Sequence, residues 1–163
     1  MPGKQKIADF KMKTTLSVLG MDFSRDGKFL IIVGGTPDFN ISIYDIEKRQ
    51  LMITPDTQLK SKKDFINVRF NPRSNKEFYI LSKSQIQFYT LKEAFTISGD
   101  NERNEAESEG EVQNFIDSWR FHVEEFSCAD IPDEGAAGPV VFTRAKWDAY
   151  NRVVMCTNLP KIF

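Results

Sequence analysis

Cys128 and His122 are the side chains whose types could form a nucleophile and base pair, and they lie six residues apart (128 − 122). Their neighbours Glu124, Glu125 and Asp130 are acidic. Nearby negative charge raises the pKa of a thiol and disfavours the thiolate, which is the reactive form of cysteine. The sequence therefore favours an unreactive cysteine and an ordinary histidine, and we expect that the protein is not an enzyme.

Carboxylates are concentrated between residues 99 and 111, where they could act as acid and base or bind a cation. Six acids stand there against one base, Arg103, so the segment carries 1 − 6 = −5 charges; the acids are Asp100, Glu102, Glu105, Glu107, Glu109 and Glu111. A segment with so few apolar residues cannot hold two carboxylates at a fixed separation. We expect a solvated loop here, with weak counterion binding at most.

The patterns of common metal and cofactor sites are absent from the sequence. Cys128 and Cys156 form no C-x-x-C pair, and the acidic run lacks the EF-hand spacing. Gly34-Gly35 follows an apolar run but belongs to no dinucleotide-binding or phosphate-binding glycine pattern. We therefore predict no catalytic residue, no metal site and no cofactor.

The composition limits the classes of partner. The chain has 163 residues, enough for one domain or a piece of a larger one, and 22 − 23 gives a net charge of −1. Without a basic excess, we expect no nucleic-acid partner. No apolar run approaches the roughly 18 residues of a membrane span, so we expect no membrane partner. Hydrophobic residues make up 40% of the chain, and 14 of the residues are phenylalanine, so a packed core is expected.

The elements that would position any site are short strands. After a polar linker over residues 1–15, four apolar or alternating runs follow in about 40 residues. Asp26-Gly27 between the first two runs is a strong hairpin signal, because glycine accepts a positive φ. The predicted strands are Val18–Phe23, Phe29–Val33, Ile41–Asp45 and Leu51–Ile53.

The same order recurs in a second block. Its predicted strands are Phe65–Phe70, Phe78–Ser82, Gln85–Tyr89 and Phe95–Ile97. Aligning the blocks places Phe23-Ser24 over Phe70-Asn71, 47 residues later. A period of about 40–50 residues with four strands per unit is typical of a propeller blade. Residues 16–98 are therefore interpreted as two blades.

The remainder is irregular and then starts the pattern again. Residues 99–139 are interpreted as the acidic loop and an insertion, in which 112–126 is either a short amphipathic helix or a segment leading into the next blade. Residues 140–163 contain two predicted strands, and Trp147-Asp148 aligns with Phe23-Ser24. We interpret 140–163 as the start of a third blade.

One stretch carries a family resemblance. Residues 20–45, GMDFSRDGKFLIIVGGTPDFNISIYD, resemble a WD40 repeat. The segment Asp22-Phe23-Ser24-Arg25-Asp26-Gly27 matches the start of the family pattern, and Tyr44-Asp45 stands in for its Trp-Asp pair. The Gly-His dipeptide of the family is absent, and the second repeat ends in Tyr89-Thr90. The resemblance implies an all-β fold of WD40-like propeller blades, two complete and one partial, with an irregular insertion.

A narrower resemblance rests on two short motifs. Thr36-Pro37-Asp38-Phe39 and Val68-Arg69-Phe70-Asn71-Pro72 are similar to segments of WD-repeat proteins of cilia and flagella, some of which tether dynein to doublet microtubules. This resemblance implies a scaffold in the cytoplasm and cytoskeleton, at the ciliary or flagellar axoneme. Its partners would be other protein chains, either axonemal or dynein-associated proteins or tubulin. The alternative is a cytoplasmic WD-repeat adaptor or the regulatory subunit of an enzyme complex.

Two groups of residues are candidates for partner contacts. Lys60, Lys62 and Lys63 lie between the two blocks and could contact an acidic surface, and Phe115 and Trp119 lie outside the repeat. A closed propeller needs about 4–8 blades, and this sequence supplies two and a fraction. We therefore expect exposed blade faces that need further blades or another chain to cover them. A small open sandwich is the alternative architecture.

Overall fold

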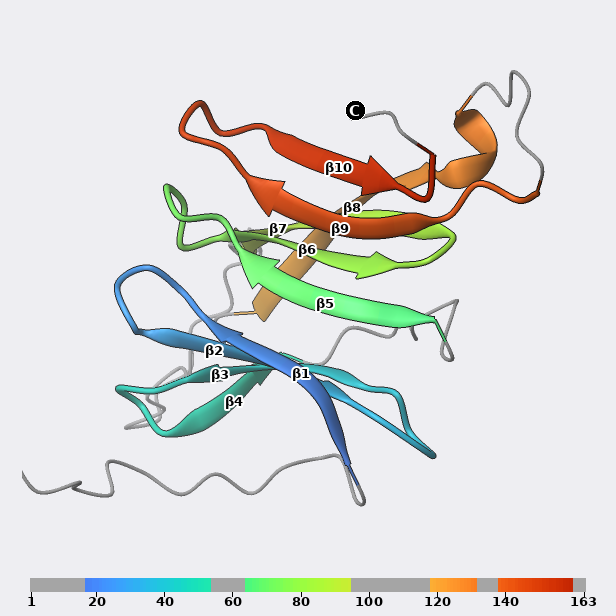
Figure 1. The fold of residues 1–163 in the computed structure, drawn as a ribbon. Coiled ribbons are helices and arrows are strands. Elements are labelled where there is room, and N and C mark those ends of the chain that lie inside the picture. Colours follow the sequence, from blue (N-terminus) through green and yellow to red (C-terminus); the bar gives the residue numbers. More distant parts are fainter. Residues whose placement is uncertain (1–16, 54–63, 95–117, 132–137, 160–163) are drawn as a thin grey trace, which may run out of the picture.

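The computed structural model describes residues 17–53, 64–94, 118–131 and 138–159 (Figure 1). These residues form three antiparallel sheets, none of which closes on itself, and one short 3-10 helix, η1 (Cys128–Asp130). The all-β prediction is therefore confirmed for the part of the chain that the structure describes. The predicted linker over residues 1–15 lies outside it.

The first sheet is a meander in which each strand pairs with the next, in the order β1-β2-β3-β4. All four strands were predicted from the sequence, and they are β1 (Val18–Phe23), β2 (Phe29–Gly34), β3 (Ile41–Asp45) and β4 (Gln50–Ile53). The hairpin between β1 and β2 places Gly27 at φ 74°, a conformation that glycine adopts without steric cost. Strand β2 is an unbroken apolar run because both of its faces are buried.

The second sheet repeats this order as β5-β6-β7-β8. Its first three strands match predicted strands, and its fourth was not predicted as a strand. The four are β5 (Phe65–Phe70), β6 (Glu77–Ser82), β7 (Gln85–Ala94) and β8 (Ser118–Ser127). Strand β8 pairs with β7 along its whole length, from Gln85 opposite Ser127 to Ala94 opposite Ser118.

The strand β8 corrects the sequence interpretation of residues 112–126. An amphipathic helix was one of two alternatives there, and it is wrong for the described part, which is extended. The predicted fourth strand, Phe95–Ile97, lies outside the described residues, and β8 takes the fourth place in the sheet. The second sheet therefore recruits a strand from beyond the acidic segment.

The third sheet has two strands among the described residues, β9 (Phe142–Trp147) and β10 (Val153–Thr157). The strands β1, β5 and β9, which come first in their sheets, lie side by side, so the sheets are stacked face to face (Figure 1). Between the first two sheets the core contains Ile31, Val33, Ile41, Ile43, Val68, Phe70, Phe78, Ile80, Tyr89 and Leu91. Between the second and third it contains Tyr79, Leu81, Ile86, Cys128, Ile131, Phe142 and Ala145.

A repeated turn follows the first strand of each sheet. Ser24, Asn71 and Asp148 come directly after β1, β5 and β9. The backbone N–H of each donates to the carbonyl oxygen of the residue that closes its turn, over 2.9, 2.8 and 2.8 Å. In each turn the short polar side chain also accepts a hydrogen bond from a backbone N–H. The three residues that align in the sequence therefore occupy equivalent positions in the structure.

Candidate interaction site

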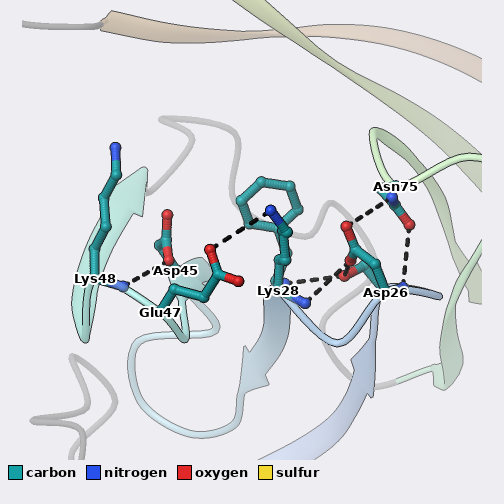
Figure 2. Close-up of polar contacts among 8 residues, drawn as sticks. Asp26, Lys28, Asp45, Glu47, Lys48 and Asn75 are labelled. Atoms are coloured by element: carbon teal, nitrogen blue, oxygen red, sulfur yellow. Dashed lines mark hydrogen bonds and ion pairs between the residues drawn. The ribbon is translucent and has the colours of Figure 1, made fainter.

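The three repeated turns are linked to one another by side-chain amides. Asp26 and Asn75 exchange hydrogen bonds between the first and second turns, with the Asn75 amide donating over 2.8 Å (Figure 2). The buried Asn71 amide donates to Glu77 in its own turn, over 2.7 Å, and to Asn151 in the third turn. These amides hold successive sheets in register at one end of the stack.

Lys28 and Lys48 make more local contacts in the first sheet. Lys28 forms an exposed ion pair with Glu47 at 3.5 Å, and the backbone N–H of Lys48 donates to Asp45 (Figure 2). Exposed ion pairs of this kind contribute little stability. The amides between the turns, unlike these local contacts, join one sheet to the next.

The first sheet leaves apolar side chains of β1 in solvent. Residues at alternate positions of a strand share a face, and Gly20 and Asp22 face the second sheet. Met21 and Phe23 therefore lie on the opposite face, where Met21 is 60% exposed and Phe23 is 54% exposed. An exposed row of large apolar residues is typical of a surface that another protein segment covers.

A cleft of about 940 Å³ opens where β5 and β9 lie side by side. Apolar groups line much of it, among them Ile66 of β5, Ala145 and Trp147 of β9 and Val154 of β10. Tyr79 also lines the cleft, and its hydroxyl donates to the carbonyl oxygen of Ala145 over 2.6 Å. Burial raises the pKa of Tyr79 to about 12, so this hydroxyl remains a neutral donor.

Three cations line the same cleft: Arg69, Arg144 and Lys146. Arg69 is paired with Asp22 at 3.3 Å. Within the described residues, Arg144 and Lys146 have no ion-pair partner. The cleft therefore combines an apolar lining with unbalanced positive charge, which suits an anionic segment with apolar side chains better than a metal ion or a neutral sugar.

The sequence-predicted contact residues are mostly not placed by the structure. Lys60, Lys62, Lys63 and Phe115 lie outside the described residues. Trp119 lies in β8, where its backbone is opposite Glu93 of β7. The prediction that these five residues contact a partner stays a prediction.

Cys128 and His122 are not assembled as a nucleophile and base. His122 lies in β8 and Cys128 begins η1 directly after that strand, so the extended segment from His122 to Ser127 separates them by roughly 16 Å or more at about 3.3 Å per residue. The buried Cys128 thiol donates to the carbonyl oxygen of Lys83 over 3.3 Å, and burial raises the pKa of this thiol. The exposed His122 instead contacts Glu124 at 3.3 Å.

Metal sites and membrane-spanning helices are absent from the described part of the chain. In the described ranges, no group of three or more histidine, cysteine, aspartate or glutamate side chains could hold a metal ion. No helix in these ranges has the length and apolar character needed to cross a membrane. No model of a known protein family matches the chain, and no curated protein matches it. The fold and the cleft define an all-β protein of stacked, repeated antiparallel sheets.

Sequence analysis missed the cleft residues Arg69, Arg144 and Lys146. Arg69 lies in a predicted strand, and the other two alternate along another predicted strand, so the strand pattern contained the signal. The missing information was which strands are neighbours, because β5 and β9 are separated by more than 70 residues in the sequence.

Proposed function

We propose that this protein is a scaffolding module that binds other protein chains, built from WD40-like propeller blades and lacking an active site. The support is the repetition itself: two complete four-stranded sheets, a further strand pair, and one kind of turn after each first strand. Face-to-face stacking with the first strands side by side is the arrangement expected of blades around a propeller axis.

One observation carries the proposal, and it concerns three equivalent aromatic residues. Phe70 ends β5 and packs on the first sheet, where it is only 6% exposed. Trp147 ends β9 and packs on the second sheet, with its ring centroid 5.9 Å from that of Tyr79. Phe23 ends β1 on the corresponding face and is half exposed. Phe70 and Trp147 each pack against the face of a neighbouring sheet. We therefore infer that Phe23 packs against the face of a further sheet when the protein is assembled.

The cellular setting follows from the narrower resemblance to WD-repeat proteins of cilia and flagella. The proposed partners are axonemal or dynein-associated proteins and tubulin, and the role is to hold them in place through rigid shape. No step of catalysis is required of any side chain in this role.

The first experiment tests whether the exposed face of β1 mediates association with another protein surface. The mass of the full chain is measured by light scattering as a function of concentration, for wild type and for the double variant Met21→Ser/Phe23→Ser. We expect concentration-dependent association of the wild type and a weaker association of the variant. Tyr150→Ser is the control, because Tyr150 is 77% exposed on a turn of the third sheet and should leave association unchanged. A compact monomer with a sharp thermal transition would contradict the proposal.

The second experiment addresses the setting. A tagged full-length protein is expressed in ciliated cells, and its position is compared with that of an axonemal marker. Axonemal localisation is the expected result. A purely cytosolic distribution would contradict the ciliary role and favour the cytoplasmic adaptor instead.

A further inference from the structure

The positive charge of the cleft between β5 and β9 is concentrated on two neighbouring side chains. Among the described residues, the charged groups at the cleft and their partners are the cations Arg69, Arg144, Lys146 and Arg152 and the acids Asp22 and Asp148, so 4 − 2 leaves a surplus of two. Asp22 neutralises Arg69, and Arg152 neutralises Asp148. The surplus therefore lies on Arg144 and Lys146, which are both exposed.

The spacing of these two cations sets the spacing of a complementary ligand. Arg144 and Lys146 are two residues apart on β9, so they share a face and are separated by about 7 Å. An extended peptide with acids at alternate positions has the same spacing of about 7 Å between its carboxylates. Opposite charges at matched positions of neighbouring extended segments attract each other.

The first sheet provides a precedent for this pairing within the same molecule. Lys146 is the residue before Trp147, as Asp22 is the residue before Phe23, so the two positions are equivalent. Asp22 pairs across the sheets with a residue of opposite charge, Arg69. Lys146, at the corresponding position, is positively charged where Asp22 is negatively charged. A residue that pairs with Lys146 in the same way would therefore be acidic.

The walls of the cleft also contain polar atoms without partners. Within the part of the chain that the structure describes, the buried Asn67 side-chain oxygen and the buried Trp147 indole N–H have no hydrogen-bond partner. They are one acceptor and one donor, and a peptide backbone offers the complementary N–H and C=O groups. Both atoms are inaccessible to solvent in the free chain, so a peptide can pair with them only if their side chains rotate. The apolar surface of Ala145 and Val154 beside them suits an apolar side chain between two acids.

We propose that this cleft binds an extended acidic segment of a partner protein, in which carboxylates at alternate positions contact Arg144 and Lys146 and the intervening apolar residue packs near Trp147. The inference deepens the proposed scaffolding function and rests on it. It uses a different surface from the exposed face of β1, so the two can fail separately.

Trp147 provides the signal for the test. Trp119→Phe leaves Trp147 as the single tryptophan of the full chain, and its emission is followed during titration with a short peptide of alternating glutamate and leucine. We expect a saturable change in emission that weakens as salt is added, because salt screens exposed charges. The matched peptide with glutamine in place of glutamate is expected to bind at least about tenfold more weakly.

Paired charge variants locate the binding. Arg144→Gln/Lys146→Gln should weaken binding of the acidic peptide at least about tenfold. Arg25→Gln/Lys48→Gln removes the same charge from exposed turns of the first sheet and should change binding less than about twofold. Equal losses in both double variants, or equal binding of the glutamine peptide, would overturn the proposal. If the peptide fails to bind while Met21→Ser/Phe23→Ser still reduces association, the cleft assignment alone is wrong.

A last variant asks whether the chain supplies its own ligand. Glu105, Glu107, Glu109 and Glu111 occupy alternate positions of the sequence and are replaced together by glutamine. We expect peptide affinity to change less than about threefold, through loss of long-range repulsion alone. An affinity at least about tenfold higher would assign the cleft to this acidic run and overturn the proposal of an external partner.

Discussion

The carboxylate of Asp22 in β1 accepts a hydrogen bond from the backbone N–H of Phe70 in β5 over 2.8 Å. The same carboxylate pairs with Arg69 at 3.3 Å. One side chain of the first sheet therefore satisfies a backbone donor of the second sheet and one of its cations. The contact joins β1 of the first sheet to β5 of the second, between residues 48 positions apart in the sequence. It therefore stabilises the packing of the two sheets against each other and not the pairing of strands within either sheet.

Asp22→Ala should weaken the joint between the first two sheets. The Phe70 N–H is partly buried and would lose its acceptor, and an unsatisfied buried donor costs about 1–3 kcal/mol. We expect the free energy of unfolding, measured in urea, to fall by that amount. Glu47→Ala removes an acid from an exposed ion pair within the first sheet, so it should cost less than about 1 kcal/mol. If the two variants lose similar amounts of unfolding free energy, the contact between the sheets contributes no more to stability than an exposed ion pair.

The equivalent residues Phe23 and Phe70 should respond very differently to truncation. Phe70→Ala leaves a cavity between two sheets and should cost about 3–5 kcal/mol of unfolding free energy. Phe23 is half exposed, so Phe23→Ala should cost less than about 1 kcal/mol in the isolated chain. Urea unfolding of both variants provides the measurement. A loss for Phe23→Ala as large as that for Phe70→Ala would mean that its face is already covered in the isolated chain.

The strands of the first sheet could be predicted because each carries its own local signal. The apolar run of β2, the alternation of β3 and the Asp26-Gly27 turn are all contained within a few neighbouring residues. The equivalence of Ser24, Asn71 and Asp148 could also be predicted, since each follows an aromatic residue at a strand end. Whether the sheets form part of a closed propeller depends on contacts that no local pattern encodes.

The fourth strand of the second sheet could not be placed because its position depends on a distant pairing. Residues 95–117 separate β7 from β8, and the entropy of closing a loop grows only slowly with its length. The alternation of Trp119, Phe121 and Val123 was a usable strand signal, but Phe115, Ile116 and Trp119 fitted a helical spacing equally well. The cleft was missed for the related reason that it lies between strands of different sheets.

Gly20 is predicted to be required where β1 meets the second sheet. A Cβ atom there would lie 2.7 Å from Cζ of Phe65 and 3.3 Å from Cγ1 of Val68, closer than packed carbon atoms lie. Gly20→Ala should therefore lower the free energy of unfolding by about 1–3 kcal/mol. Gly138→Ala is the control, because a Cβ atom at Gly138 would meet nothing within 4 Å. The idea fails if the two substitutions have the same effect on the urea midpoint.

The third turn should make stability depend on pH through Asp148. Its carboxylate accepts hydrogen bonds from the backbone N–H groups of Arg152 and Tyr150 and from the Arg152 guanidinium. The backbone bond from Arg152 is the largest of the influences that hold the pKa of Asp148 below its usual value of 3.8. A carboxyl whose pKa is lower in the folded state contributes stability above the unfolded pKa, and this contribution is lost as the pH falls through the folded pKa.

The measurement is the difference in unfolding free energy between wild type and Asp148→Asn, followed from neutral pH down to about pH 3. Asparagine keeps the acceptor oxygen but carries no charge, so the other carboxyl groups cancel in the difference. As the pH falls below 3.8, the usual aspartate pKa, we expect the unfolding free energy of the wild type to decrease relative to that of Asp148→Asn. The asparagine of the variant does not titrate, so its contribution to the unfolding free energy does not change with pH. Glu47→Gln, in an exposed ion pair, should give a curve parallel to wild type. A parallel curve for Asp148→Asn as well would show that the hydrogen bonds of this turn do not favour the charged carboxylate.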